Sequence, residues 1–351
     1  MLDEKKSINK ILLISHEMSY TGAPNSLLNI STILRTQGKH VEVVTLKEGP
    51  FEREFKEQDI AVQYLDSYNA IEDRAKNFDF VIANTIFCAE ITYKLQYVVP
   101  TVLFIREAKN ILELVNGCNI NIEWIKNTQK IWCVSEYAKE YIQLYCNREA
   151  NVIYNCINDY FDNDTNVVKE KVHFLIMGTI EPRKAFDVAI KAFKKLPWYL
   201  SKYAVLHIVG KPGAWCKEYV AEVLGNVDGT RIIYHGEIDN NSSKYDFLKE
   251  INVVIVASRD ESCSLVALEG AMLAKALIVT ENVGAKYIVD KNGYVVKTDS
   301  IHAMKKAIKK MIRNRKEMEK FGQYSREYYS QTSTYEVYSK NIIRLLEVEN
   351  E

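Results

Sequence analysis

The sequence lacks an excess of charge of either sign, and it also lacks a long apolar run. Lys and Arg together number 46, and so do Asp and Glu, so no overall electrostatic field favours nucleic acid as a partner. No run approaches the roughly 18 apolar residues that a membrane span needs, and the N-terminal stretch MLDEKKSINK does not have the pattern of a signal peptide. We therefore expect a cytoplasmic protein that does not bind nucleic acid.

The cysteines lack the spacing of a metal site or a disulfide framework. There are 7, scattered along the chain, and none forms a CxxC pair, which is typical of reduced cytosolic residues. An Asp-Asn-Asp stretch at 162–164 has the pattern of a metal-binding Asp-x-Asp, but it lies in a polar segment away from any predicted strand end. We predict a solvated linker there, and we expect neither a metal ion nor another cofactor.

Apolar runs of strand length alternate with helical patterns through most of the chain, which is typical of α/β proteins with parallel sheets. A polar, Asn/Asp-rich segment at 158–167 divides these runs into two series. The first series comprises 11–15, 41–46, 80–84, 101–105, 131–134 and 151–154, and the second comprises 172–178, 204–210, 231–236, 253–257 and 276–280. We also predict a helix from Pro24 with Gly38 as its C-terminal cap, and a helix from Lys184 to Leu196.

The two series predict two doubly wound, Rossmann-like domains, and 351 residues suffice for about two domains. We assign residues 1–158 to the first domain, 168–325 to the second, and 326–351 to a C-terminal helix that packs back onto the body. Two such domains leave a central cleft facing the carboxyl ends of both sheets, where open α/β sheets bind ligands. The helical pattern of this last segment spans residues 334–347 and is carried by Tyr335, Tyr338, Ile342 and Leu345.

The stretch DESCSLVALE (260–269) places two carboxylates, Glu261 and Glu269, around the start of a predicted helix. Ser262 and Ser264 are N-cap candidates, because their hydroxyls accept hydrogen bonds from the first helix amides. A loop that joins a buried strand to a helix N-terminus is a common ligand site in α/β proteins.

This stretch and several others together resemble a known enzyme family. The matching segments are SYTGAPNSLLNI (19–30), MGTIEPRKAFDVAIKAF (177–193), HIVG (207–210), YHGEID (234–239) and residues 257–296. The residues of these segments, and the order of the segments along the chain, resemble those of the retaining GT-B glycosyltransferases of family 4, which use nucleotide-sugar donors. The resemblance covers nearly the full length, is most specific at the Glu-x7-Glu stretch, and is looser in the first half.

The resemblance implies different roles for the two carboxylates. Glu261 would contact the sugar hydroxyls of the donor, and Glu269 would bind the ribose hydroxyls through charge-assisted hydrogen bonds. The alternatives are a helix-cap acid for Glu261 and a carboxylate on a solvated face for Glu269. The helix N-terminus would add donor-binding backbone amides, at Ser262, Cys263, Ser264 and Leu265.

The resemblance also implies that Arg183 and Lys184 neutralise the diphosphate as the sugar leaves, in place of a metal ion. The alternative is a pair of surface cations at a helix start. Thr179 stands where many relatives have arginine, so Arg183 would supply that charge from another position. Ala185 replaces the usual glycine after the lysine.

Further donor-binding residues implied by the resemblance are small or lie at predicted strand ends: Gly22, Ala23, Gly210 and His235. Small residues such as Gly22 let the backbone approach a phosphate closely. A loop of this kind also begins many NAD-binding domains, but the chain has no GxGxxG and no acidic residue at the expected ribose position, which argues against a dehydrogenase.

Arg106 and Glu107 occupy the place where many relatives have a His-Glu pair. Arg106 keeps its proton and so is no base; the resemblance makes it a catalytic residue that holds an oxygen, and a structural Arg106–Glu107 ion pair is the alternative. His16, after the first strand, is a second residue that would line the cleft, although a structural role is the simpler interpretation.

We therefore expect a metal-independent, retaining transfer of a sugar from a nucleotide diphosphate to a hydroxyl of a glycan, glycolipid or glycoprotein, in bacterial surface polysaccharide or glycan assembly. The alternatives are a non-catalytic GT-B partner subunit and a nucleotide-sugar epimerase. Residues 305–320 form a basic helical pattern. A solvated helix explains it, and weak association with the anionic inner membrane face is the alternative.

Overall fold

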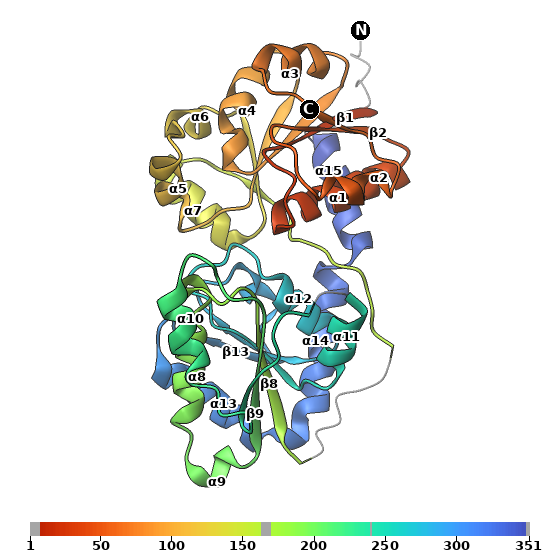
Figure 1. Ribbon diagram of the computed structural model, residues 1–351. Coiled ribbons are helices and arrows are strands. Elements are labelled where there is room, and N and C mark those ends of the chain that lie inside the picture. The colour runs from red at the N-terminus through yellow and green to blue at the C-terminus, as the bar shows by residue number, and fades with distance from the viewer. Residues whose placement is uncertain (1–7, 163–169, 239–240, 349–351) are drawn as a thin grey trace. The chain divides into compact units, whose positions relative to one another are not determined.

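Both sheets in the computed structural model consist of parallel strands, as the apolar runs predict. The structure describes residues 8–162, 170–238 and 241–348. The chain divides into unit 1, Met1–Asn155 with Tyr335–Glu351, and unit 2, Cys156–Thr334. Figure 1 shows the elements of both units in the colours of the chain order.

The sheet of unit 1 has seven strands in the order β3-β2-β1-β4-β5-β6-β7. The order reverses between β1 and β4, which makes the sheet doubly wound. Residues 11–14 of the central strand are fully buried, because helices cover both faces of such a sheet. The strands are β1 (Lys10–Ser15), β2 (His40–Thr45), β3 (Val62–Tyr64), β4 (Phe80–Asn84), β5 (Thr101–Ile105), β6 (Lys130–Cys133) and β7 (Asn151–Val152).

The helices of unit 1 lie between successive strands along the chain, except for the last helix, which comes after unit 2. Ser135 caps α7 by accepting a hydrogen bond from the backbone N–H of Ala138. The helices are α1 (Gly22–Thr36), α2 (Glu52–Lys56), α3 (Tyr68–Ala75), the 3-10 turn η1 (Ile86–Cys88), α4 (Ala89–Leu95), α5 (Ile111–Gly117), α6 (Ile122–Lys126), α7 (Glu136–Cys146) and α15 (Tyr335–Val348).

The sheet of unit 2 has six strands in the order β10-β9-β8-β11-β12-β13, again all parallel. Its core includes Phe174, Phe186 and Phe193, and the rings of Phe174 and Phe193 meet edge to face with centroids 6.0 Å apart. The strands are β8 (Val172–Met177), β9 (Ala204–Val209), β10 (Ile232–Tyr234), β11 (Val253–Val256), β12 (Ala276–Thr280) and β13 (Gly293–Val296).

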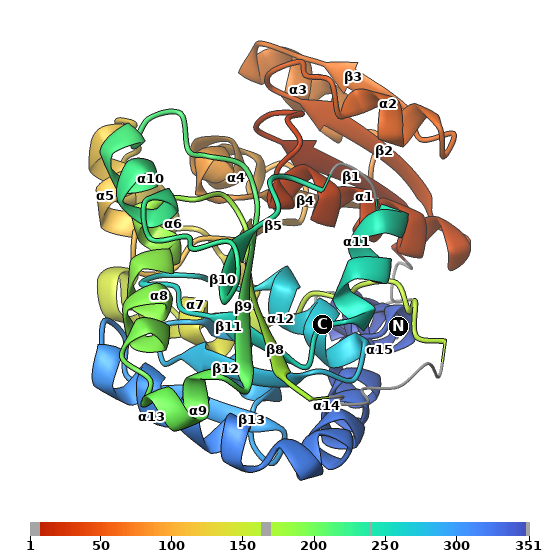
Figure 2. The same ribbon diagram turned by 60° about the horizontal axis from the view of Figure 1, so that its bottom comes forward.

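Helices cover both faces of this second sheet. Figures 1 and 2 show α8, α10 and α13 on one face and α11, α12 and α14 on the other. The elements are η2 (Pro182–Lys184), α8 (Phe186–Lys194), α9 (Trp198–Ser201), α10 (Lys217–Leu224), α11 (Asn241–Lys249), α12 (Leu265–Met272), η3 (Gly284–Ile288), α13 (Ile301–Arg313), η4 (Arg315–Glu317) and α14 (Met318–Thr332). The lysines of α13 alternate with buried positions and face away from the core, which fits a helix with one solvated face.

The predicted strands are confirmed, and two further strands complete the sheets. β3 and β13 are edge strands, and they contain exposed apolar residues, such as Tyr64 and Val295. None of the three residues of β3 is buried, and only two of the four residues of β13 are, so neither strand forms the continuous buried apolar run that identified the others.

Two predicted helix starts are wrong by a few residues. The first helix begins at Gly22 rather than Pro24, and Gly38, with φ +75°, follows its end as predicted. The helix predicted from Lys184 begins instead at Phe186, after the 3-10 turn η2. Ala185 separates the two with φ +52°, a left-handed conformation that favours glycine and that no α-helix contains.

The C-terminal segment predicted as one helix over 326–351 is two helices that belong to different units. α14 ends at Thr332 in unit 2, and α15 begins at Tyr335 in unit 1. α15 packs beside α1, where the Tyr335 hydroxyl donates a 2.6 Å hydrogen bond to Asn29 Oδ1. The helix predicted over 334–347 is confirmed as α15, and its Tyr338, Ile342 and Leu345 are buried.

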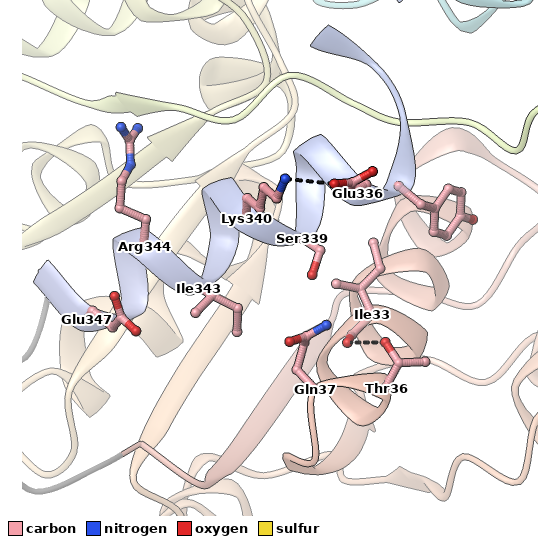
Figure 3. Close-up of a pocket in the computed structure, with 10 residues that line it drawn as sticks. Ile33, Thr36, Gln37, Glu336, Ser339, Lys340, Ile343, Arg344 and Glu347 are labelled. Carbon is pink, nitrogen blue, oxygen red and sulfur yellow. Dashed lines mark hydrogen bonds and ion pairs between the residues drawn. The ribbon is translucent and has the colours of Figure 1, made fainter. Parts of the chain in front are cut away.

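A groove of about 620 Å³ runs along the outside of this helix pair (Figure 3). Its lining mixes both charge signs, and Lys340 pairs with Glu336 at 2.7 Å across one helix turn. The lining residues are Ile33, Thr36, Gln37, Tyr335, Glu336, Ser339, Lys340, Ile343, Arg344 and Glu347. In the described part of the chain, no helix combines the length and the apolar character that a membrane crossing requires.

Candidate active site

Two loops at the carboxyl edge of the unit 2 sheet carry the predicted catalytic residues of that unit. Arg183 and Lys184 lie in η2 after β8, and Glu261 lies between β11 and α12. β8 and β11 are neighbouring parallel strands, so the loops that follow them meet at one edge. The fold therefore joins Lys184 to a carboxylate 77 residues further along the chain.

Glu261 receives three side-chain contacts, all on one oxygen. The Lys184 ammonium and Arg183 Nη1 form ion pairs with Oε2, the latter at 3.1 Å, and Ser258 Oγ donates to the same atom at 3.4 Å. No described residue donates a hydrogen bond to Oε1. The Glu261 side chain is only 13% exposed, and it is therefore a largely buried, paired carboxylate with one oxygen left for a further donor.

Burial and pairing act on the pKa of Glu261 in opposite directions. Burial alone raises it, because a carboxylate loses its hydration. The positive charges of Lys184 and then Arg183 outweigh that effect, and the pKa of Glu261 lies below its usual value. Glu261 is consequently ionised at neutral pH. The interpretation of Glu261 as a plain helix-cap acid does not hold, because the α12 cap is Ser264, whose Oγ accepts from the backbone N–H of Ala267.

Arg259, which the sequence did not single out, ties the two loops together. Its backbone N–H donates to the Arg183 carbonyl at 2.8 Å, and its guanidinium contacts the Pro182 carbonyl. The same guanidinium pairs with Asp187, at the start of α8, at 3.1 Å, and with Asp299 at 2.7 Å. Arg259 therefore fixes η2 against the loop that carries Glu261.

The backbone of Glu261 is fixed from a third loop. Its N–H donates to the Asn282 carbonyl at 3.1 Å, and its carbonyl accepts from the Gly284 N–H at 2.7 Å. Arg183 is held in turn by Glu181, whose Oε1 lies 2.7 Å from Nη2. The three charged side chains of this cluster are thus positioned by loops after β8, β11 and β12.

The residues before α12 lie where the sequence predicts them. Ser264 is the N-cap and is buried, whereas Ser262 and Leu265 are half-buried and Cys263 is buried. Ser262, the other cap candidate, is not the cap. Glu269 lies just over one turn after the start of α12, on a buried side of the helix.

Glu269 is a buried carboxylate with a cationic partner, and the solvated-face alternative is therefore wrong. Its side chain is 9% exposed, and Oε1 lies 2.8 Å from Nζ of Lys244 on α11. Burial raises the pKa of Glu269, and Lys244 opposes that rise. Lys244 is the second residue that the sequence did not single out.

Gly210 follows β9, and close packing of the backbone explains why a glycine is required there. With φ +141°, it lies so near Gly178 that a Cβ built on it would overlap the Gly178 carbonyl oxygen. Its N–H donates to the Gly236 carbonyl at 2.7 Å. The ends of β8, β9 and β10 are thereby drawn together at the carboxyl edge.

His235 is the exposed end of a chain of three histidines on three neighbouring strands or their ends. His207 Nδ1 lies 2.8 Å from His235 Nε2, and His207 Nε2 lies 2.9 Å from His173 Nδ1. The rings stack at 5.1 Å. Burial, with the two neighbouring imidazoles, lowers the pKa of His207 to about 4.

Arg106 lies in unit 1, at the carboxyl edge of its sheet, among neutral partners. Nε donates to Asn84 Oδ1 at 2.9 Å and Nη1 to Asn155 Oδ1 at 2.8 Å, and the guanidinium stacks 3.8 Å from the centroid of Phe104. The Glu107 carboxylate accepts from the backbone N–H of Arg106 at 3.0 Å. Burial raises the pKa of Glu107 to about 7.

The first loop of unit 1 carries the remaining predicted residues. A Cβ on Gly22 would meet no atom within 4 Å, so the protein itself does not require a glycine there. The Ala23 carbonyl accepts from Asn84 Nδ2 at 3.0 Å. His16 Nδ1 lies 3.0 Å from Oγ1 of Thr85, a β-branched residue in the strained conformation φ +77°.

Among the described residues, no group of three or more His, Cys, Asp and Glu side chains is arranged to hold a metal ion. In the Asp-Asn-Asp stretch, Asp162 pairs with Lys249 at 2.6 Å. Residues 163 and 164 lie outside the described residues.

Comparison with known proteins gives matches in both halves of the chain. A family model described as glycosyl transferases group 1 matches residues 159–328, and one described as glycosyl-transferase family 4 matches residues 7–108. An uncharacterized glycosyltransferase of Methanocaldococcus jannaschii is 26% identical over 207 residues. That alignment covers 58% of this chain and 55% of the relative, so the chain spans about half the length of the curated relative that it matches.

Solved structures match nearly the whole chain. HepE of Anabaena, solved in complex with UDP, has a TM-score of 0.83 and 16% identity, over 97% of this chain and 100% of that one. WaaG, a glycosyltransferase involved in lipopolysaccharide biosynthesis, has a TM-score of 0.71 and 15% identity, over 96% and 99% of the two chains. These likenesses show the GT-B fold, with two Rossmann-like domains.

Proposed function

This chain belongs to glycosyltransferase family 4, with the GT-B fold, and we propose that it transfers a sugar from a nucleotide-diphosphate sugar to a hydroxyl of a glycan, glycolipid or glycoprotein, with retention at the anomeric carbon. The cluster of Arg183, Lys184 and Glu261 carries this proposal. In this cluster, three loops fix two cations and an ionised carboxylate in place at one edge of the sheet.

The cluster supplies the charges that sugar transfer needs. When the bond from the anomeric carbon to the diphosphate oxygen breaks, negative charge grows on the leaving group and positive charge on the sugar ring. Lys184 and Arg183 stabilise the first, and Glu261 Oε1 accepts a hydrogen bond from a sugar hydroxyl. The acceptor hydroxyl then bonds to the anomeric carbon, and a leaving phosphate oxygen takes its proton.

Glu269 binds the ribose of the same donor, and Ser262, Cys263, Ser264 and Leu265 line its phosphate side. Gly210 and His235 contribute from the loops after β9 and β10. In unit 1, we keep Gly22 and Ala23 as donor-binding residues and Arg106 as a catalytic residue, as the resemblance implies. UDP is the first nucleotide to test, because HepE was solved with UDP and with UDP-glucose. The named role of WaaG in lipopolysaccharide biosynthesis supports a surface glycan as the acceptor. We place the reaction in the cytoplasm, at or near the membrane surface.

The test is incubation of the protein with UDP-, GDP- and ADP-sugars, with donor hydrolysis and thermal protection as readouts. The proposal expects one nucleotide class to raise Tm and to be hydrolysed slowly without an acceptor, with the released sugar initially in the anomeric configuration of the donor. A non-catalytic partner subunit would show protection without hydrolysis. An epimerase would return a free sugar or nucleotide sugar inverted at a ring carbon other than the anomeric one.

A further inference from the structure

Lys244 is the cationic partner of Glu269, and it comes from a different helix. It lies in α11, before β11, whereas Glu269 lies in α12, after that strand. Lys244 Nζ is 2.8 Å from Glu269 Oε1, and the two side chains are 21% and 9% exposed. Because an ion pair with this little exposure has lost most of its hydration, each charge depends on the other.

The ammonium of Lys244 is held from a second side. Nζ lies 4.7 Å from the ring centroid of Tyr245, within the range of a cation–π contact. Tyr245 in turn stacks on Tyr160 at 4.3 Å, and the Tyr160 backbone N–H contacts the sulfur of Met272 on α12. The cation is therefore fixed by the Glu269 carboxylate and by the Tyr245 ring, which Tyr160 connects to α12.

Three other cations near α12 have different partners. Lys275, just after the helix, donates to the Lys249 carbonyl at 2.8 Å. Arg326 on α14 donates to the Met272 carbonyl at 2.7 Å and pairs with Asp159 at 2.8 Å. Lys286 in η3 donates to the Glu281 carbonyl at 3.2 Å. The neighbouring strands β11 and β12 present apolar residues, among them Val254 and Leu277 beside Gly270. Among the described side chains, Lys244 is the one that contacts the Glu269 carboxylate.

We propose that Lys244 is a positioning residue for the nucleotide: it holds Glu269 as a carboxylate, fixes Oε1, and leaves Oε2 to accept hydrogen bonds from the ribose hydroxyls. This inference rests on the proposed function. No described residue donates to Oε2, and the ribose hydroxyls are donors of the required kind. Without the cation, burial favours the protonated carboxyl, which has lost the negative charge that strengthens these hydrogen bonds.

The experiment measures UDP binding by calorimetry to the full chain and to three single variants. Lys244→Met keeps the apolar stem and removes the charge, Lys244→Arg keeps a charge, and Lys249→Met is the matched control. Lys249 lies in the same helix but pairs with Asp162 and Asp246 instead. We expect roughly tenfold weaker binding for Lys244→Met, the effect of one weakened charge-assisted hydrogen bond, a smaller loss for Lys244→Arg, and none for Lys249→Met.

A double-mutant cycle with Glu269→Gln separates positioning from a general structural loss. If Lys244 acts through Glu269, Lys244→Met has little further effect in the Glu269→Gln background. Likewise, Lys244→Met weakens UDP but leaves the affinity for 2′,3′-dideoxy-UDP nearly unchanged, because that probe has no ribose hydroxyls. Equal losses for both probes would overturn the inference.

The pH dependence gives an independent readout, with UDP-glucose as the probe because it has no phosphate monoester that titrates near neutrality. Burial already raises the pKa of Glu269, and Lys244 opposes that rise, so loss of the cation raises the pKa further. Binding to Lys244→Met therefore weakens at a higher pH than wild-type binding does as the solution is acidified. If Lys244→Met is unstable, Lys244→Gln replaces it, with Tm measured for each variant.

Different outcomes test the nucleotide site and the role of Lys244. If the wild-type protein binds no nucleotide of the panel, the proposed function is wrong. If it binds UDP and Lys244→Met binds equally well or more tightly, then only the role of Lys244 is wrong. Tighter binding would mean that Lys244 competes with the ribose for Glu269.

Discussion

Lys184 and Glu261 form an ion pair between two loops that lie 77 residues apart in the sequence. Because Lys184 is aimed at the site where we place the diphosphate, Lys184→Ala should lower kcat by roughly 10²–10³, the effect of losing one preorganised charge-stabilising group. Lys211→Ala is the control, since Lys211 is 62% exposed on the loop after β9. Donor hydrolysis and acceptor transfer measure the change, and a rate loss below about threefold would contradict the assignment.

Chelation should leave turnover intact. The reason is the placement of Arg183 and Lys184, which supply fixed positive charge beside Glu261. The measurement compares the initial rate in EDTA with that after adding Mg²⁺ or Mn²⁺. Loss of activity in EDTA that either ion restores would show that these side chains do not replace a metal.

Glu261→Gln and Glu269→Gln should have different signatures. Glu269 is assigned to the ribose, so Glu269→Gln should weaken UDP and UDP-sugar alike, by roughly tenfold to a hundredfold. Glu261 is assigned to the sugar, so Glu261→Gln should depress kcat and leave UDP affinity nearly unchanged. Calorimetry with UDP on both variants separates the cases. Equal losses would remove the division of roles between the two carboxylates.

The histidine chain should make stability fall in acid. Burial and the neighbours His173 and His235 lower the pKa of His207 to about 4, whereas an unfolded histidine titrates near 6.5. Between these values the unfolded chain binds the additional proton, so the free energy of unfolding falls as pH drops from about 6.5 to 4, by on the order of 2–3 kcal/mol. Urea unfolding across this range measures it. His207→Leu should flatten the slope, and an unchanged slope would assign it to other groups.

Ala185→Gly should be nearly neutral for stability, although Ala185 is fully buried. Relief of the left-handed φ gains about 1–2 kcal/mol, and it is offset by a lost methyl, about 0.8 kcal/mol, and by the freedom of glycine in the unfolded chain, about 0.4–1 kcal/mol. Ala189, equally buried within α8, is the matched control. Ala189→Gly lacks the strain relief and should cost about 2 kcal/mol. Equal losses in chemical denaturation would contradict the strain at Ala185.

The sequence predicts best the parts of this fold that are buried on both faces. Residues 11–14 and 253–256 are apolar throughout because helices cover both sides of a parallel strand, and this pattern is visible without any partner. The short strand β3, none of whose residues is buried, lacks it. The start of α8 was also missed, because nothing in the sequence alone shows that Ala185 adopts a left-handed conformation.

The candidate site also contains residues that the sequence predicted and residues that it did not. Glu261, Lys184 and Arg183 were found because they carry the family resemblance, and the structure joins them. Arg259 and Lys244 were not found, because each acts through a partner on another element, 72 and 25 residues away. Their side chains are ordinary for a loop and a helix surface, and only the packing of the elements gives them their contacts.

The return of α15 to unit 1 sets an order on how the protein is made. Ile157, near the start of unit 2, donates its backbone N–H to the carbonyl of Ser333, near its end, at 3.2 Å, so the chain enters and leaves this unit at adjacent points. During translation the whole of unit 2 leaves the ribosome before α15 does. The face of α1 that receives Tyr335 therefore stays uncovered until the chain has been made through unit 2, so unit 1 cannot complete its packing while only its N-terminal part, residues 1–155, has been synthesised.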